Sequence, residues 1–263
     1  MLLAQLTDTH ILDPERGDEQ MVDNNHRLAL AVEAINAEHP RPEVVLATGD
    51  LTNNGHPGEM EQLEQLLAPL EVPLLALPGN HDDQEAFRAT FDMAWADDHL
   101  SWVADLGELM IVGLDTTVPG QHPGLLDATR EQWLQEALTE TAGRPTAIAM
   151  HHPPFLSGLD AMDASTLGRA DAFAKVVSSY DNIQRILCGH LHRPVVTTVS
   201  GVTTSSCLST VHHVGLNLNP GAKIELIRDP AGYQLHRVSN GNWITHTRYI
   251  DTGEVAVVPA WAR

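Results

Sequence analysis

Five short motifs place acidic, amide and imidazole side chains directly after apolar runs of the sequence. Oxygen and imidazole ligands together suit Mn, Fe, Zn or Co better than a metal that prefers thiolate. The side-chain types therefore point to metal-ion chemistry, in which bound ions activate water and neutralise developing charge. The motifs are Asp8-Thr9-His10, Gly49-Asp50, Gly79-Asn80-His81-Asp82, His151-His152 and Gly189-His190-Leu191-His192.

The positions of the motifs explain how residues far apart in the sequence can meet. Open α/β sheets place their ligands at the C-terminal edges of their strands, so groups that follow separate strands can share one crevice. Side chains two positions apart on an extended segment point the same way, which pairs Asp8 with His10 and His190 with His192. A single Asp-x-His motif is common by chance and more often forms a turn or a cap, so the prediction depends on the ordered set.

Apolar runs that alternate with amphipathic stretches predict the elements that carry these motifs. Helices are expected at 24–38, 57–67 and 127–142, with Pro57 at a first helical position and Asp127 as an N-cap. Such alternation indicates a layered α/β fold. The expected strands are LLAQL, EVVLAT, PLLALP, ELMIVGL and TAIAM.

After Gly189 the sequence becomes strand-like, with the segments RPVVTTV, KIELIR, YQLHRV and NWITHTRYI. We therefore expect a catalytic core over residues 1–200. A β-rich part over 201–263 would complete the fold or form an oligomer contact. The stretch 153–169 is the longest loop-like segment and is a candidate for part of a lid or an oligomer contact.

The composition limits the partners and the compartment. A formal charge of −20 over 263 residues disfavours a nucleic-acid polymer, because backbone binding needs clustered Lys and Arg. Small anions remain compatible, since bound divalent metals reverse the local field. Two cysteines, Cys188 and Cys207, are too few for a disulfide framework, and no apolar run approaches the roughly 20 residues of a membrane span. The opening MLLAQL lacks the basic segment of a signal peptide, so a cytoplasmic protein without a membrane partner is expected.

The ordered motifs D-x-H, GD, GNHD, HHPP and GHLH resemble those of the calcineurin-like metallophosphoesterase superfamily, over the stretch from Asp8 to His192. LTDTH, TGDLTNNG, PGNHDD, MHHPP and CGHLH look most like the branch of class III cyclic nucleotide phosphodiesterases and glycerophosphodiesterases. Ser/Thr phosphoprotein phosphatases would show RG after the GD motif and GNHE, whereas this chain has Asn54-Gly55 and Asp82. Purple acid phosphatases carry a Tyr ligand where Asn53 stands here.

The resemblance implies an α/β fold, namely a four-layer αββα sandwich with two mixed β sheets. It also implies two divalent metal ions that share the carboxylate of Asp50. One ion would be held by Asp8, His10, Asp50 and His192. The other would be held by Asp50, Asn80, His151 and His190.

The activity implied by the resemblance is hydrolysis of small phosphodiesters, either 3′,5′-cyclic nucleotides or glycerophosphodiesters, by attack of a metal-bound hydroxide. His81 matches the motif histidine that acts near the leaving group, where it would donate a proton or a hydrogen bond to the departing oxygen. The alternatives are a broad-specificity phosphomonoesterase, a nuclease that uses the same site, or a scaffold without activity. A homo-oligomer is expected from the family alone.

Several neighbouring residues have more than one interpretation. Asp82 could orient His81 or cap the following helix, and Asp83 is the expected cap. Asn53 could touch the phosphate or simply favour a turn, and His152 is expected to be structural because it points away from its neighbour. His212 and His213, in TVHHVG, either help to bind substrate or form an exposed pair. Solvated or hydrogen-bonded positions without a metal role are expected for His26, His39, His56, His99, His122, His236 and His246.

Overall fold

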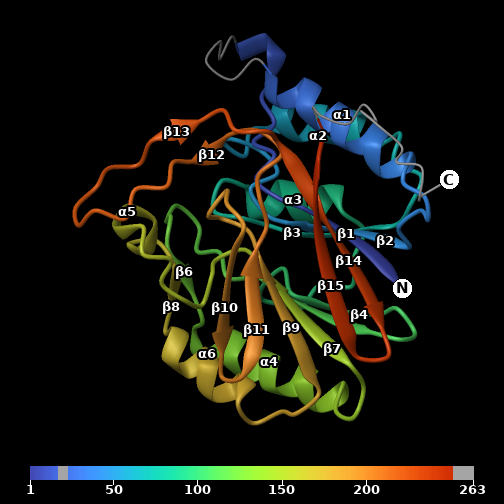
Figure 1. Ribbon diagram of the computed structural model, residues 1–263, viewed down its shortest axis with the longest axis vertical. Coiled ribbons are helices and arrows are strands. Elements are labelled where there is room, and N and C mark those ends of the chain that lie inside the picture. The colour runs from blue at the N-terminus through green and yellow to red at the C-terminus, as the bar shows by residue number, and fades with distance from the viewer. Residues whose placement is uncertain (17–22, 251–263) are drawn as a thin grey trace, which may run out of the picture.

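The structure of the chain is a computed structural model, and it describes residues 1–16 and 23–250. Two large β sheets lie face to face between two layers of helices (Figure 1). The expected C-terminal part, 201–263, is described only as far as residue 250. Among the described residues, no helix is both long and apolar enough to span a bilayer.

The first sheet has the strand order β15-β14-β1-β2-β3. The strands β1, β2 and β3 run parallel to one another, β14 runs antiparallel to β1, and β15 runs antiparallel to β14, so the sheet is mixed. The apolar runs that predicted the first three strands are buried, as parallel strands covered on both faces must be. The strands are β1 (Leu2–Leu6), β2 (Val44–Thr48), β3 (Leu74–Leu77), β14 (Gly232–Ser239) and β15 (Asn242–Tyr249).

The second sheet has the strand order β10-β11-β9-β7-β5-β4 and is also mixed. The sequence predicted β5, β7 and β10 directly, β9 lies in the apolar, strand-like run IQRILCGH, and β4 and β11 were not singled out. Its strands are β4 (Trp102–Asp105), β5 (Met110–Leu114), β7 (Thr146–Met150), β9 (Ile183–Cys188), β10 (Val195–Val199) and β11 (Val202–Ser206).

Helices cover the outer face of each sheet (Figure 1). Pro57 begins α2 and Asp127 caps α4 by accepting from the backbone N–H of Arg130, as predicted. Asp83 caps α3 by accepting from the backbone N–H of Ala86, which confirms the expected cap. The helices are α1 (Asp23–Asn36), α2 (Pro57–Leu67), α3 (Gln84–Thr90), α4 (Ala128–Glu140) and α6 (Ala170–Val177).

Three apolar clusters separate four layers of structure. One packs α1, α2 and α3 on the first sheet through residues such as Leu28 and Leu63. Another packs α4 and α6 on the second sheet through Leu134 and Phe173. The third lies between the sheets and includes Leu46 and Leu187. The predicted four-layer αββα sandwich with two mixed sheets is therefore confirmed.

Smaller elements lie at one end of the sandwich. A two-stranded ribbon of β12 (His213–Val214) and β13 (Leu226–Ile227) lies apart from the large sheets, and its loop reaches toward α5 (Figure 1). The strand expected for KIELIR is thus only two residues long, because most of that segment is exposed and unpaired. The loop-like stretch 153–169 contains only α5 (Asp160–Asp163) and β8 (Leu167–Gly168), and β8 pairs with β6 (Gly124–Leu125). A 3-10 turn, Pro14–Arg16, follows β1.

A buried polar chain joins the two sheets. The Gln5 amide of β1 donates to the Thr48 hydroxyl and to the Cys188 carbonyl of the second sheet. Its oxygen accepts from His236 Nε2 at 3.0 Å, and His236 Nδ1 accepts from the Thr245 hydroxyl at 2.9 Å. Both nitrogens of the neutral His236 ring are therefore satisfied, and burial together with the charge of Arg185 lowers its pKa to about 3.

We expect His236 to make the metal-free protein lose stability in acid. Its pKa is lower when folded than when unfolded, so the unfolded chain takes up a proton that the folded chain refuses as the pH falls below about 6.5. In urea unfolding, the wild-type protein should lose about 2 kcal/mol more than His236→Gln between pH 7.5 and pH 5. Exposed His26→Gln is the control, and parallel curves for all three proteins would contradict the assignment.

Candidate metal centre

The backbone at the motifs is left-handed rather than extended. Asp8, His10, Asp50, His190 and His192 have φ values of 52°, 43°, 52°, 69° and 51°. Such conformations cost about 1–3 kcal/mol each in non-glycine residues and cluster at functional sites. The expectation that each pair lies on an extended segment is therefore wrong. The chain turns sharply as it leaves each strand, and these turns direct the side chains toward one another.

Four of the five motifs contribute side chains to the lining of one cavity of about 530 Å³, whereas Asp8 and the His151 of the remaining motif are fully buried and do not line it. The strands that precede the motifs are β1, β2, β3, β7 and β9, so their C-terminal ends supply the polar side chains, as predicted. The cavity is also bordered by segments around residues 161–165 and by the β12–β13 ribbon. Asn53, His122 and His212 line it together with residues of the four motifs.

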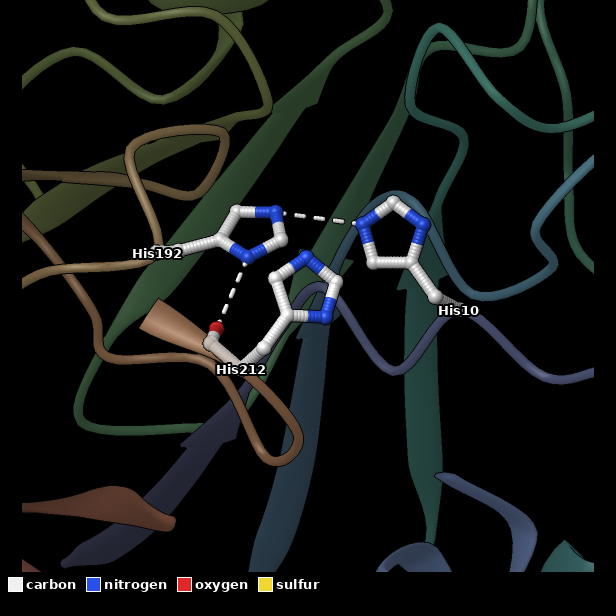
Figure 2. A group of neighbouring side chains, drawn as sticks. All are labelled: His10, His192 and His212. Atoms are coloured by element: carbon white, nitrogen blue, oxygen red, sulfur yellow. Dashed lines mark hydrogen bonds between the residues drawn. The ribbon is translucent and has the colours of Figure 1, made fainter. Parts of the chain in front are cut away.

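The first group of candidate ligands has donor atoms that all lie within 4.8 Å of one another. His192 Nε2 is 3.4 Å from Asp8 Oδ1 and 3.1 Å from His10 Nε2. His192 Nδ1 donates to the His212 carbonyl at 2.9 Å, so the neutral ring directs the Nε2 lone pair at its neighbours (Figure 2). The group is Asp8, His10, Asp50 and His192, the set expected for one ion.

The second set lies on the other side of Asp50. His151 Nδ1 donates to the Thr48 carbonyl at 2.8 Å, which directs Nε2 at Asp50 Oδ2, 3.4 Å away. Burial opposes the charged ring, but the carboxylates of Asp50 and Asp8 raise the pKa of His151 to about 9, so a bound cation would take the place of the Nε2 proton. The buried Oδ1 of Asn80 has no hydrogen-bond partner in the described parts of the chain. His190 packs against His151, with ring centroids 5.1 Å apart. The two histidines of the GHLH motif therefore lie beside different candidate sets, His192 near Asp8 and His190 near His151.

His152 lies in the same buried cluster but both of its ring nitrogens are engaged. Nδ1 is 2.7 Å from the Thr116 hydroxyl and Nε2 is 2.9 Å from the His122 carbonyl. A carbonyl accepts, so Nε2 carries the proton and Nδ1 accepts from the hydroxyl. These contacts agree with the structural role expected for this residue.

Asp50 lies between the two sets. Its Oδ1 accepts from the backbone N–H of His81 at 2.8 Å. Its Oδ2 is 3.4 Å from His151 Nε2 and 3.8 Å from His10 Nε2. One carboxylate is therefore adjacent to donor atoms of both sets, which is the arrangement that a bridging ligand requires.

The electrostatics of the cluster fit divalent cations. Burial raises the pKa of Asp8 to about 7, and burial lowers the pKa of His192 to about 4. Burial also holds the pKa of His10 and His190 well below its ordinary value. Their rings are therefore neutral at physiological pH, as metal binding requires. Several buried acceptor atoms, imidazole nitrogens and carboxylate oxygens, lie close together, and the described residues supply too few hydrogen-bond donors to satisfy them. Such a set of atoms is suited to bind a cation.

His81 lies beside the first group with a defined tautomer. Its Nδ1 donates to the Asn53 carbonyl at 2.6 Å, which leaves Nε2 able to accept or carry a proton. The ring meets His10 edge-on at a centroid distance of 4.8 Å and lines the cavity. Asn53 therefore contacts His81 through its backbone, a role that neither interpretation of its side chain anticipated.

Asp82 neither orients His81 nor caps α3. Its carboxylate accepts from the backbone N–H groups of Leu51, Thr52 and Gly79, and from the Thr52 hydroxyl. It thus ties the loop that carries Asp50 to the loop that carries Asn80. The sequence did not reveal this role, because it depends on two loops that are 30 residues apart.

The two loops approach each other so closely at position 79 that only glycine, which has no Cβ, fits there. A Cβ there would lie 2.2 Å from both the backbone nitrogen and Oδ1 of Asp50. We expect Gly79→Ala to displace Asp50 and weaken Mn²⁺ binding by about 10- to 100-fold, as is typical when support of a ligand is lost. Gly143→Ala is the control, because its Cβ would meet nothing within 4 Å; with a φ of +79° it tests backbone strain without a steric clash. Equal Mn²⁺ affinities in equilibrium dialysis would contradict this role.

Two residues at the cavity rim were missed as site residues. The exposed His122 places Nδ1 3.3 Å from the Asn80 amide nitrogen, and the Ser165 hydroxyl is 3.2 Å from His190 Nε2. Neither follows a strand in a motif, so the sequence offered no signal for them. His212 lines the cavity with its ring 4.6 Å from that of His192, whereas His213 is not among the lining residues (Figure 2).

Comparisons with known proteins bear on the family and the fold of the chain. A probable glycerophosphodiester phosphodiesterase from Arcobacter nitrofigilis is 32% identical over 256 residues, covering 95% of this chain and 93% of the relative. A cAMP/cGMP dual specificity phosphodiesterase from Mycobacterium tuberculosis is 33% identical, covering 84% of this chain and 70% of the relative. A dimetal phosphatase from Danio rerio shares the fold, with a TM-score of 0.72 at 13% identity over 95% of this chain and 96% of that one.

The family model described as calcineurin-like phosphoesterase matches residues 1–194. This range contains all five motifs. The sequence relatives carry the names of glycerophosphodiester and cyclic nucleotide phosphodiesterases, the branch that the motifs resembled. The chain belongs to the calcineurin-like phosphoesterase family.

Proposed function

We propose that the protein is a binuclear metal-dependent hydrolase of small phosphodiesters. The observation that carries the proposal is the position of Asp50, whose Oδ2 lies within 4 Å of imidazole nitrogens from both candidate sets. The relatives named as phosphodiesterases support the same reaction. Either a 3′,5′-cyclic nucleotide or a glycerophosphodiester would be the natural substrate.

The ligands of the two ions are proposed from the geometry. When bound, such ions supply an activated water and charge neutralisation at phosphorus. The oxygen and imidazole donors suit Mn, Fe, Zn or Co. Asp8, His10, Asp50 and His192 would hold one ion. Asp50, Asn80, His151 and His190 would hold the other.

The chain itself orients the candidate ligands and supplies a proton donor for the leaving group. The carbonyls of Thr48 and His212 fix the rings of His151 and His192, so each ring already turns its Nε2 toward a carboxylate. The carbonyl of Asn53 fixes the ring of His81, whose Nε2 would donate a proton to the departing alkoxide.

The charge of the cavity favours a diester over the alternatives. Among the described residues that line it, none is Lys or Arg. A monoester dianion therefore finds no side-chain cation beyond the ions themselves, whereas a diester carries a single charge. The net charge of −20 likewise opposes a polymeric nucleic acid. We also propose a cytoplasmic location, where the buried thiols of Cys188 and Cys207 stay reduced.

The proposal is tested by turnover of bis(p-nitrophenyl) phosphate, cyclic AMP and glycerophosphoethanolamine by the Mn²⁺-loaded protein. Hydrolysis of the diesters should exceed that of p-nitrophenyl phosphate, and the preferred natural diester would identify the substrate class. Absence of turnover with each of Mn, Fe, Zn and Co would refute an enzymatic role and favour a scaffold. Cleavage of single-stranded DNA at a comparable rate would favour a nuclease.

A further inference from the structure

One side of the cavity is apolar. Met162 and Val214 are buried there, whereas Ile224 and Leu226 remain 48% and 56% exposed. Val214 and Leu226 are register partners across the β12–β13 ribbon, so their side chains lie on the same face. We call Met162, Val214, Ile224 and Leu226 the apolar wall.

The apolar wall is held in place. The backbone N–H of Gly221 donates to Asp160 of α5 at 2.8 Å, which ties the loop of the ribbon to the helix. Arg193 donates to the Val214 carbonyl at 2.6 Å. A small cluster that contains Leu159 and Leu191 packs behind Met162 and Val214. The ribbon therefore presents apolar side chains from a fixed position rather than from a loose loop.

The polar and apolar sides of the cavity come from different segments. His81 and Asn80 follow β3 of the first sheet, whereas the apolar wall belongs to α5 and the ribbon. The Ser165 contact with His190 joins the segment after α5 to the candidate ligands. An ester group that departs beside His81 would therefore lie among polar side chains, whereas the group that remains on phosphorus would lie against the apolar wall.

We propose that the apolar wall is a subsite for an apolar ester group that stays on phosphorus. This inference rests on the proposed diester hydrolysis and extends its substrates, beyond the two natural candidates, to diesters whose retained alcohol has an aliphatic or other apolar portion. Ile224 and Leu226 would lose their water contact when that group binds. The continuity of the wall with the cavity of the candidate ligands identifies substrate as its occupant.

The test uses alkyl p-nitrophenyl phosphates with methyl, butyl and hexyl groups. The leaving group is p-nitrophenolate throughout, so only the retained group varies. For the Mn²⁺-loaded wild-type enzyme, kcat/KM should rise by about two- to fourfold for each methylene that the wall covers, from the usual gain on burying such a group. In the double variant Ile224→Ser, Leu226→Ser this rise should shrink to less than about half of the wild-type rise.

The matched control is Leu216→Ser, Leu218→Ser. Both leucines lie in the segment between β12 and β13, are 63% and 61% exposed, and are not among the lining residues. This variant should keep the wild-type dependence on chain length. A flat wild-type series, or an equal slope in the wall variant, would overturn the subsite while leaving diester hydrolysis intact.

Two further outcomes are decisive. An equal loss on all three esters, with a change in molar mass by light scattering, would overturn the subsite and identify the wall as a contact between copies of the chain. No hydrolysis of any ester by the Mn²⁺-loaded wild type would instead refute the proposed function, and the subsite with it.

Discussion

Asp50→Asn should remove nearly all diesterase activity and at least one bound ion per chain. The amide keeps the size of the carboxylate and can still accept from the backbone N–H of His81. It loses the negative charge between His10 and His151, so it can no longer serve both ions. Loss of one preorganised electrostatic group costs about 100- to 1,000-fold in kcat. Because this change affects both ions, we expect a loss on the order of 1,000-fold or more in kcat/KM for bis(p-nitrophenyl) phosphate.

The matched control is Asp98→Asn, which removes the same charge at an exposed position. It should keep two ions and wild-type turnover. Elemental analysis after dialysis measures the metal content, and circular dichroism checks the fold. Two tightly bound ions together with wild-type turnover in Asp50→Asn would show that this carboxylate is not the bridge.

His81→Ala should separate the roles of metal binding and proton donation. Both ions should remain, because none of the candidate ligand atoms belongs to this side chain. A poor alkoxide leaving group depends on the proton, so kcat for glycerophosphoethanolamine should fall by about 100- to 10,000-fold. The p-nitrophenolate of bis(p-nitrophenyl) phosphate leaves without help, and its kcat should fall by about 10-fold at most.

The control for this change is the exposed His26→Gln of α1, which should behave as wild type on both substrates. The ratio of the two losses is the informative quantity, since a general disturbance would lower both rates alike. Equal losses on the alkyl and aryl substrates would therefore assign His81 to positioning rather than to proton donation.

Local signals in the sequence predicted the scaffold well. The helix from Pro57 to Leu67 was predicted at its observed bounds, because proline suits the first turn. The short strands before the motifs were equally clear, since central strands buried on both faces are continuous apolar runs. The resemblance then supplied the arrangement of two sheets, which periodicity alone does not give.

The shape of the site depended on contacts that no local signal encodes. The left-handed turns at Asp8 and His190 form because buried backbone hydrogen bonds hold them, such as the one from the Asp8 N–H to the Gly49 carbonyl. The clamp made by Asp82 joins two loops, and the position of His122 depends on a long connection. Such tertiary contacts override the extended geometry that the motif spacing suggested.

The most direct test of the two-ion site is a titration of the metal-free enzyme with Mn²⁺. Bound metal and turnover of bis(p-nitrophenyl) phosphate would be measured in the same samples. We predict that turnover rises mainly with the second ion and stops rising at two ions per chain. Full turnover at one ion per chain, or turnover that persists without metal, would contradict a binuclear centre built around Asp50.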